Sequence, residues 1–121
     1  MKILYMFDVD ETLEVSHGPI KLTQLVNLFN QGHIIGLCGN WGLFVNVVQD
    51  WHRVISVMGC WPGQRKHEFL REVKRIIPAN RYVMIGNVNP SNAPYSDRDE
   101  ALLARWEFIE EKDFLEGIDE Q

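Results

Sequence analysis

The sequence contains little cysteine and no long hydrophobic run. Only two of its 121 residues are cysteines, Cys38 and Cys60, and they lack the C-x-x-C spacing of redox and metal motifs. The apolar run at the N-terminus is interrupted at Asp8, long before it could serve as a signal or membrane segment. These shortages predict a reduced, cytoplasmic protein that does not enter a membrane.

The chain also has few histidines and no excess of positive charge. The four histidines show no zinc-ligand spacing, so we expect them in loops or at the surface. A formal net charge of −5 argues against a general nucleic-acid binder but leaves room for a small phosphorylated substrate at a local basic spot. No repeat, low-complexity linker or inserted second domain is visible. We therefore expect a single domain over residues 1–121, with an acidic tail from about 110 to 121.

Apolar runs alternate with segments of helical periodicity along most of the chain. This alternation is typical of βαβ units and a parallel sheet. It predicts an α/β fold, a three-layer α/β/α Rossmann-like domain with a mostly parallel central sheet. The expected strands cover residues 2–7, 33–38, 53–58, 82–85 and 106–109, and the expected helices cover residues 22–29, 41–50, 64–77 and 97–104. In the second helix, the periodicity places Leu43, Val47 and Trp51 on one face.

The first strand ends at two carboxylates and a hydroxyl, Asp8, Asp10 and Thr12, spaced i, i+2, i+4. An unbroken apolar run indicates a buried parallel strand. Ligands of open α/β sheets bind beyond the carboxyl ends of such strands. In an extended segment, residues i and i+2 share a face, so both carboxylates can point to one site. The non-functional alternative is that Asp8 and Asp10 only end the strand and cap the next turn.

Three further blocks follow at compatible spacing: Leu37-Cys38-Gly39-Asn40, then Lys66 at a helix start, then Gly86-Asn87 with Asp97 and Asp99. Together with the first block, they resemble the haloacid dehalogenase superfamily, in its small capless, phosphatase-type form. The resemblance covers nearly the whole chain, and the order of the blocks carries more weight than any one of them. Lys66 also has a plain alternative, as one member of a solvated basic helix face.

The resemblance implies a Mg²⁺-dependent phosphatase that acts through an aspartyl-phosphate intermediate. Asp8 would be the nucleophile, with the ordinary ionisation of an aspartate, and Asp10 would protonate the leaving oxygen and later activate water. Lys66 would offset the repulsion between nucleophile and phosphate. The implied phosphate-binding residues are Thr12, Cys38, Gly39 and Asn40, the latter two aided by backbone N–H groups at a helix start. The implied Mg²⁺ ligands are Asp8, Asp10, Asn87 and Asp97.

Two positions depart from the family pattern. Asn87 stands where the family has an aspartate, and Cys38 stands where it has serine or threonine. The missing negative charge weakens a metal site unless Asp97, ten residues later, or Asp99 folds back to restore it. These departures favour the alternative of a catalytically weakened relative that binds a phosphorylated ligand or a protein partner. A dehalogenase is less favoured, because Asp10 and Thr12 match the phosphatase form of the first motif.

The segment between Leu13 and Lys21 is too short to hold a cap domain. An open site of this kind suits a phosphorylated small molecule or an accessible phosphate on a larger molecule, and a neighbouring subunit of a homo-oligomer could roof it. His17 lies in this loop, over the expected site. Trp41, Trp61 and Tyr95 could stack on a base or sugar at its mouth, although aromatic side chains at such positions more often pack.

Overall fold

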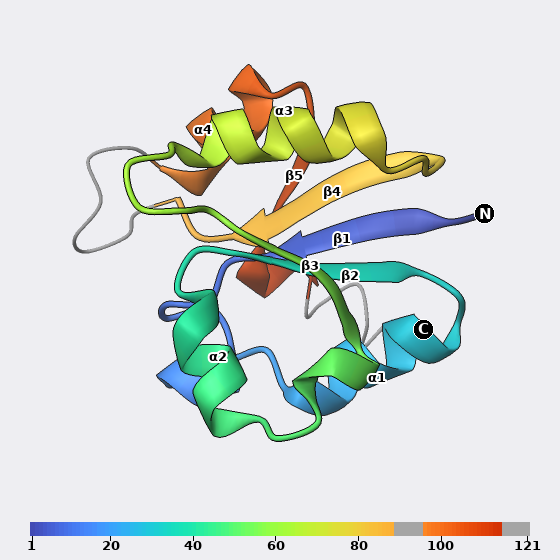
Figure 1. The fold of residues 1–121 in the computed structure, drawn as a ribbon, viewed down its shortest axis with the longest axis vertical. Helices are drawn as coiled ribbons and strands as arrows, with labels where there is room; N and C mark the ends of the chain where they lie inside the picture. Colours follow the sequence, from blue (N-terminus) through green and yellow to red (C-terminus); the bar gives the residue numbers. More distant parts are fainter. Residues whose placement is uncertain (89–95, 115–121) are drawn as a thin grey trace.

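The fold is built on a five-stranded, all-parallel sheet in the order β3-β2-β1-β4-β5 (Figure 1). A computed structural model describes residues 1–88 and 96–114. The strands are β1 Ile3–Phe7, β2 Ile34–Cys38, β3 Ile55–Gly59, β4 Arg81–Gly86 and β5 Glu107–Glu110. The helices are α1 Leu22–Asn30, α2 Trp41–Val47, α3 Lys66–Ile76 and α4 Asp97–Leu103, with the 3-10 turns η1 Glu14–Ser16 and η2 Trp51–Arg53. The predicted Rossmann-like α/β fold is confirmed.

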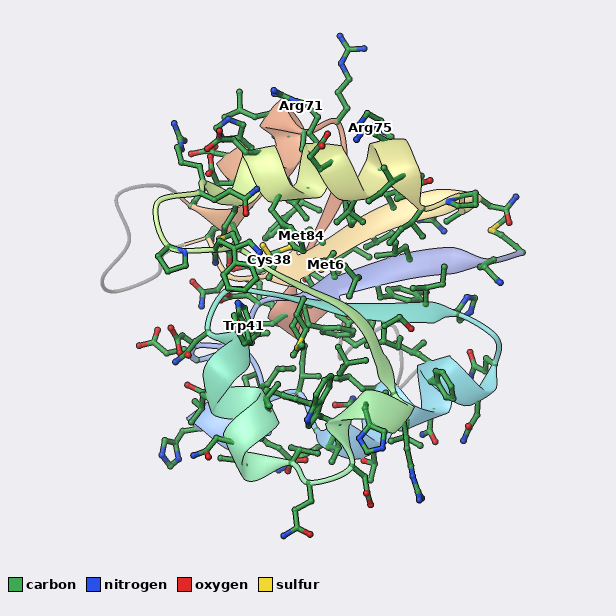
Figure 2. All side chains as sticks on the ribbon, viewed as in Figure 1. Met6, Cys38, Trp41, Arg71, Arg75 and Met84 are labelled. Atoms are coloured by element: carbon green, nitrogen blue, oxygen red, sulfur yellow. The ribbon has the colours of Figure 1, made fainter. Side chains whose placement is uncertain are left out.

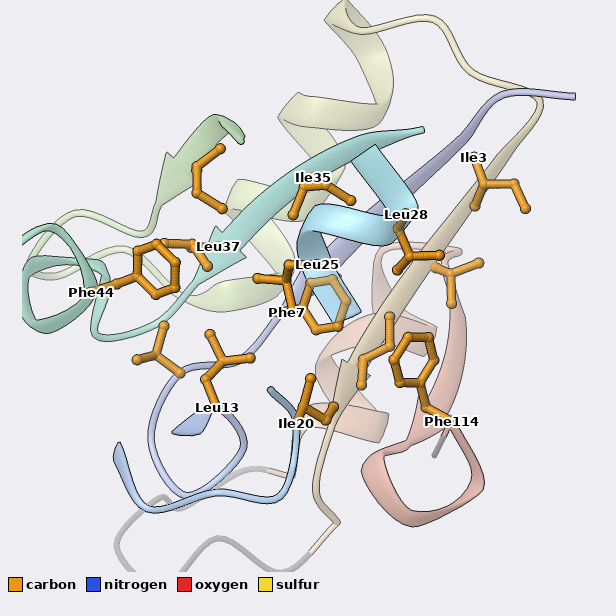
Figure 3. Close-up of a cluster of buried hydrophobic side chains, with 14 residues drawn as sticks. Ile3, Phe7, Leu13, Ile20, Leu25, Leu28, Ile35, Leu37, Phe44 and Phe114 are labelled. Carbon is orange, nitrogen blue, oxygen red and sulfur yellow. The ribbon is translucent and has the colours of Figure 1, made fainter. Parts of the chain in front are cut away.

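Helices cover both faces of the sheet, with α1 and α2 on one side and α3 and α4 on the other (Figure 1). Alternate residues of β1 serve the two layers, because successive side chains of a strand point to opposite faces. Phe7 packs on the α1 side with Leu25 and Leu28 (Figure 3), and Met6 packs on the α3 side with Leu70. Both faces of β1 are therefore buried, as its unbroken apolar sequence predicted.

The second predicted helix was wrong in its length. Helix α2 ends at Val47, and Trp51 begins the separate turn η2. Phe44 is the buried residue of α2, whereas Val47 is 54% exposed. The chain leaves the helix because Val48 is extended, so the helical periodicity that joined Leu43, Val47 and Trp51 does not persist.

The C-terminal segment is more structured than an acidic tail from residue 110. Glu110 is the last residue of the edge strand β5, which pairs with β4. Phe114 is buried, with its ring edge-on to Phe7 at 5.6 Å and close to Tyr5 at 6.2 Å. The expectation of a tail beginning near 110 is thus corrected, because apolar packing of Phe114 anchors this stretch to the core. Residues 115–121 lie outside the described residues.

The order of the strands creates a crevice position beside β1. The chain moves from β1 through α1 to β2 and β3 in one direction, then returns by α3 to β4 on the other side of β1. Such a reversal splays the connections apart at the carboxyl ends of the strands, where open α/β sheets bind ligands. Asp8, Gly39, Cys60 and Asn87 directly follow β1, β2, β3 and β4 at this edge. Among the described residues, no helix has the length and apolarity to cross a membrane.

Candidate functional site

The centre of the site is a lysine held between two buried aspartates. Lys66 Nζ donates to Asp8 Oδ1 and to Asp97 Oδ1, each at 2.8 Å. The side chain of Lys66 is 25% exposed, whereas those of Asp8 and Asp97 are 6% and 3% exposed. The three residues come from the end of β1 and the first turns of α3 and α4. Residues 58 and 31 positions apart thus meet beside the strand reversal.

Local chemistry explains why Asp97 reaches this position. Ser96 caps α4, because its hydroxyl accepts a hydrogen bond from the backbone of Asp99, so the helix begins at Asp97. Asp97 Oδ2 in turn accepts a hydrogen bond from the backbone N–H of Asn87 at 3.2 Å. A Cβ at Gly86 would clash with the Asp97 carboxylate, so only glycine admits the aspartate here. Asp97 therefore folds back to the end of β4, while Asp99 is exposed on the helix surface.

Glycine is required at a second position, Gly39. Its φ of +139° is unfavourable for side-chain-bearing residues. A Cβ there would lie 2.8 Å from Asp8 Oδ1 and 3.7 Å from Lys66 Nζ. The backbone after β2 consequently runs directly over the Asp8–Lys66 pair, which puts Gly39 at the site as the sequence suggested.

The shared lysine makes the site electrostatically unusual. Burial raises the pKa of Asp8 to about 7, the charge of Lys66 opposes the rise, and the charge of Asp97 adds to it. Burial lowers the pKa of Lys66, but the charges of Asp8 and Asp97 outweigh burial and raise this pKa above its ordinary value. The ammonium is thus retained. The ordinary aspartate ionisation expected for Asp8 was wrong, because the sequence did not reveal that its carboxylate is buried and shares one cation with a second carboxylate.

Asp10 and Thr12 have different surroundings. Thr12 is buried, and its hydroxyl donates to Asp8 Oδ2 over a long 3.4 Å. Asp10 is exposed, and its Oδ1 accepts a hydrogen bond from Asn40 Nδ2 at 3.1 Å. Asp10 therefore stands at the mouth of the site and ties the loop after β1 to the loop after β2.

Several donors and acceptors of the loop after β2 are already hydrogen-bonded within the protein. The N–H of Gly39 donates to Gly59 O at 2.7 Å, and the N–H of Trp41 donates to Gly39 O at 2.8 Å. The side chain of Asn40 caps α2 through Leu43 and donates to Asp10. These groups hold the loop rather than standing free for a phosphate. Cys38, at the end of β2, is completely buried.

Two buried oxygens beyond the carboxyl ends of β4 and β5 suit a hard cation. Asn87 Oδ1 is buried without a hydrogen-bond partner among the described residues, as is Glu111 Oε2. Burial raises the pKa of Glu111, a hydrogen bond with Thr12 opposes the rise, and Glu110, Asp97 and Glu11 add to it. Unsatisfied buried oxygens are rare, and a cation with oxygen ligands would satisfy them. Among the described residues, however, no group of three histidine, cysteine or acidic side chains is preformed as a metal site.

Sequence reasoning missed a second charged cluster beside Lys66. Arg65 donates from Nε and Nη2 to both oxygens of the buried Glu100, at 3.3 and 2.6 Å, and His67 contacts the same carboxylate. Glu100 lies three residues after Asp97 on α4. This i, i+3 spacing was the available signal, since such residues share a helix face. Glu100 anchors the start of α3 on both sides of Lys66 and so helps position its amine.

Replacing Glu100 by Gln is expected to lower the free energy of unfolding by about 1–2 kcal/mol at neutral pH, because charged hydrogen bonds to a half-exposed Arg65 are lost. Burial raises the pKa of Glu100, but the hydrogen bonds from Arg65 and His67 outweigh it and lower this pKa overall. The stabilisation is therefore present above the unfolded-state pKa and disappears as pH falls through the folded-state value.

Urea unfolding of both chains at several pH values measures this difference. The matched control is Glu72→Gln, which breaks the exposed pair with Arg75 and should leave stability nearly unchanged. Equal effects of the two substitutions would show that Glu100 has no anchoring role.

The aromatic and histidine positions around the mouth are partly occupied by packing. Trp41 Nε1 donates to Cys60 O at 3.3 Å, and its ring lies edge-on to Trp61 at 5.7 Å. Trp61 is 68% exposed, so it alone of this pair offers a large free surface. His17 is exposed at the end of η1. Tyr95 lies outside the described residues.

No family model matches the chain, and no curated protein or solved structure is significantly similar to it. The fold and the geometry of the site are therefore the observations from which a function is inferred.

Proposed function

We propose that the protein is a phosphatase that hydrolyses phosphoryl esters through a covalent intermediate on Asp8. The observation that carries the proposal is the buried Asp8–Lys66–Asp97 cluster at the strand reversal of a Rossmann-like sheet. An oxygen nucleophile, a fixed cation and a ligand-binding position of the fold coincide there. An ion pair that only stabilised the fold would not require a nucleophile, a fixed cation and a ligand-binding position at the same place.

The two oxygens of Asp8 suit different tasks. Oδ1 is fixed by Lys66 at 2.8 Å, whereas Oδ2 accepts the longer contact from the Thr12 hydroxyl at 3.4 Å. In the proposed reaction, ionised Oδ2 attacks phosphorus, the bond from phosphorus to the ester oxygen breaks, and an aspartyl-phosphate forms. Lys66 keeps the carboxylate oriented and offsets its repulsion from the phosphate charge.

Asp10 suits the proton transfers because it is exposed at the mouth, where a leaving group would depart. In the first step it protonates the leaving oxygen. In the second step it takes a proton from water, which attacks phosphorus and releases phosphate from Asp8. The hydrogen bond from Asn40 limits where the Asp10 carboxylate can point.

Asp8, Asn87 and Asp97 would hold Mg²⁺, with Asp10 contributing as the resemblance implies. Glu111, whose pKa Thr12 and Asp97 influence, is a further candidate acid that the sequence did not suggest. The unpaired oxygens of Asn87 and Glu111 support this oxygen-rich donor set. The bound cation would neutralise phosphate charge and favour the ionised form of Asp8. Without it, two aspartates and one lysine leave a net negative charge facing an anionic substrate.

The second candidate is a binding protein for a phosphorylated ligand or a protein partner, with weak or no turnover. The engaged N–H groups of Gly39 and Trp41 favour it, because fewer donors remain for the transferring phosphate oxygens. The buried Cys38 favours it too, since a thiol is a weak donor. Both candidates use the same edge of the sheet and differ in whether a covalent intermediate forms.

Trapping of that intermediate distinguishes the two candidates. The chain is mixed with an aryl phosphate in Mg²⁺ or in chelator, quenched in acid, and analysed by intact mass and peptide mapping. We expect phosphate on Asp8, with much less of it in chelator. The binding-protein proposal is correct instead if an aryl phosphate protects the chain against thermal unfolding while no phosphate is found on Asp8 under either condition.

A further inference from the structure

The sheet brings the only two cysteines of the chain together beside the site. Cys38 is the last residue of β2 and pairs in register with Gly59, the last residue of β3. Cys60 follows Gly59 directly, and both cysteines belong to the same packed cluster, where each thiol shifts the pKa of the other. Neighbouring strands are about 4.8 Å apart, and disulfides span Cα distances of about 4.4–6.8 Å. Cys60 stands one residue beyond the position opposite Cys38, so the two residues are near enough for a disulfide to be considered.

The two thiols differ in access. Cys38 is completely buried, whereas Cys60 is half-buried after the end of β3. The half-buried Cys60 is the one that a dissolved oxidant can reach, and the buried Cys38 is already its neighbour. This arrangement of an accessible cysteine and an adjacent resolving cysteine is typical of redox-responsive pairs.

The surroundings make Cys60 the more reactive sulfur. The hydrogen bond from Cys38 lowers the pKa of Cys60 to about 6, burial opposes this, and the positive charge of Lys66 adds to the lowering. The same hydrogen bond raises the pKa of Cys38 well above its ordinary value, and burial raises it further. The lowered pKa favours the thiolate, the nucleophilic form, at Cys60, whereas the raised pKa of Cys38 favours its thiol.

We propose that Cys60 and Cys38 form a reversible disulfide in response to a peroxide, and that this modification switches off the site around Asp8. The second half of the proposal rests on the proposed phosphatase function, whereas the first half does not. Cys38 lies at the phosphate-binding position implied by the sequence, and Figure 2 shows it near Met6 and Met84, with which it packs.

The chemistry proceeds in two balanced steps. The Cys60 thiolate attacks one oxygen of hydrogen peroxide, the O–O bond breaks, and hydroxide leaves, which oxidises the sulfur to a sulfenic acid. The Cys38 sulfur, losing its proton, then attacks the Cys60 sulfur, and the sulfenic oxygen leaves as water. A dithiol reductant reduces the resulting disulfide by thiol–disulfide exchange and restores both thiols.

The disulfide would alter the site through the loop after β2. Gly39 follows Cys38 and lies directly over Asp8 Oδ1 and Lys66 Nζ. Bonding Cys38 to Cys60 ties this loop to the loop after β3, which Trp41 already contacts through its hydrogen bond to Cys60 O. A displacement of the order of 1 Å at a catalytic group lowers rates by about 10²-fold, so an activity loss of about tenfold or more is expected.

The test uses the full chain, reduced and then treated with hydrogen peroxide. Intact mass should show the loss of two hydrogen atoms, thiol titration of the unfolded chain should find no free thiol, and dithiothreitol should reverse both. Cys60→Ser should not form the bond. In Cys38→Ser, the Cys60 sulfenic acid should persist and be captured by dimedone. The disulfide proposal is overturned if the oxidised parent gains oxygen atoms without losing the two hydrogens.

Activity is measured separately on the same samples. We expect aryl phosphate hydrolysis by the parent to fall with peroxide and return with dithiothreitol, while Cys60→Ser keeps its activity in peroxide. A disulfide that forms without affecting hydrolysis would contradict the switch. A disulfide that forms in a chain with no hydrolysis at all would contradict the proposed phosphatase function and the switch, and would leave the redox modification itself established.

Discussion

Asp8→Asn is expected to lower aryl phosphate hydrolysis by at least about 10³-fold, because an amide lacks the nucleophilic oxygen that would form the covalent intermediate. Folding should be retained. Asparagine has nearly the shape of aspartate, and its oxygen can still accept the hydrogen bond from Lys66. Two buried carboxylates share one ammonium in the parent chain. Removing one negative charge should therefore lower the free energy of unfolding by less than about 1 kcal/mol, or raise it. Turnover assays and urea unfolding measure the two effects.

Asp50→Asn is the matched control for this substitution. Asp50 is exposed and precedes η2 and β3, so it lies toward the amino end of the sheet, opposite the site. It should leave both turnover and stability unchanged. Hydrolysis by Asp8→Asn at the parent rate would refute the role of Asp8, and equal losses in both variants would point to an indirect effect.

Lys66→Met is expected to affect both activity and stability. Hydrolysis should fall by about 10²–10³-fold, because the fixed cation that offsets phosphate repulsion is lost. The free energy of unfolding should fall by about 2–3 kcal/mol, since Asp8 and Asp97 stay buried without their shared partner. Steady-state kinetics at saturating substrate separates this loss of rate from any loss of folded protein, provided that the folded fraction is measured in parallel.

Two variants sharpen this result. Lys74→Met removes a lysine two turns further along α3, where it contacts Arg105 O at the surface, and should leave hydrolysis unchanged. Lys66→Arg keeps the charge but changes its shape, so it should recover much of the stability and less of the activity. Full hydrolysis by folded Lys66→Met would show that the cluster is only a structural ion pair.

Much of the fold could be predicted because the same pattern, an apolar strand followed by an amphipathic helix, recurs along the chain. The unbroken apolar segment before Asp8 predicted a central strand, and alternation with amphipathic segments predicted a parallel sheet. The errors occurred where a local sequence pattern was compatible with two different structures. The apolar periodicity from Leu43 continued past the true end of α2, and the acidic composition after residue 110 concealed Phe114, whose ring fills space beside β1.

The site could be predicted only in part. The spacing of Asp8 and Asp10, and the position of Lys66 at a helix start, follow from short sequence patterns. The choice of Asp97 over Asp99 depended on the cap formed by Ser96 and on the absence of a side chain at Gly86. Glu100 gave only a weak helical spacing signal, and the proximity of Cys60 to Cys38 gave none, because it arises from strand pairing.

The sequence by itself determined the class of fold, the central strand and the acids that end it, since these depend on hydrophobic pattern and on neighbours along the chain. Only the tertiary structure decided which distant charges share Lys66, how the pKa of Asp8 shifts, and which two thiols meet. Burial and the pairing of charges are properties of segments packed together, and a linear pattern does not record the distances between them.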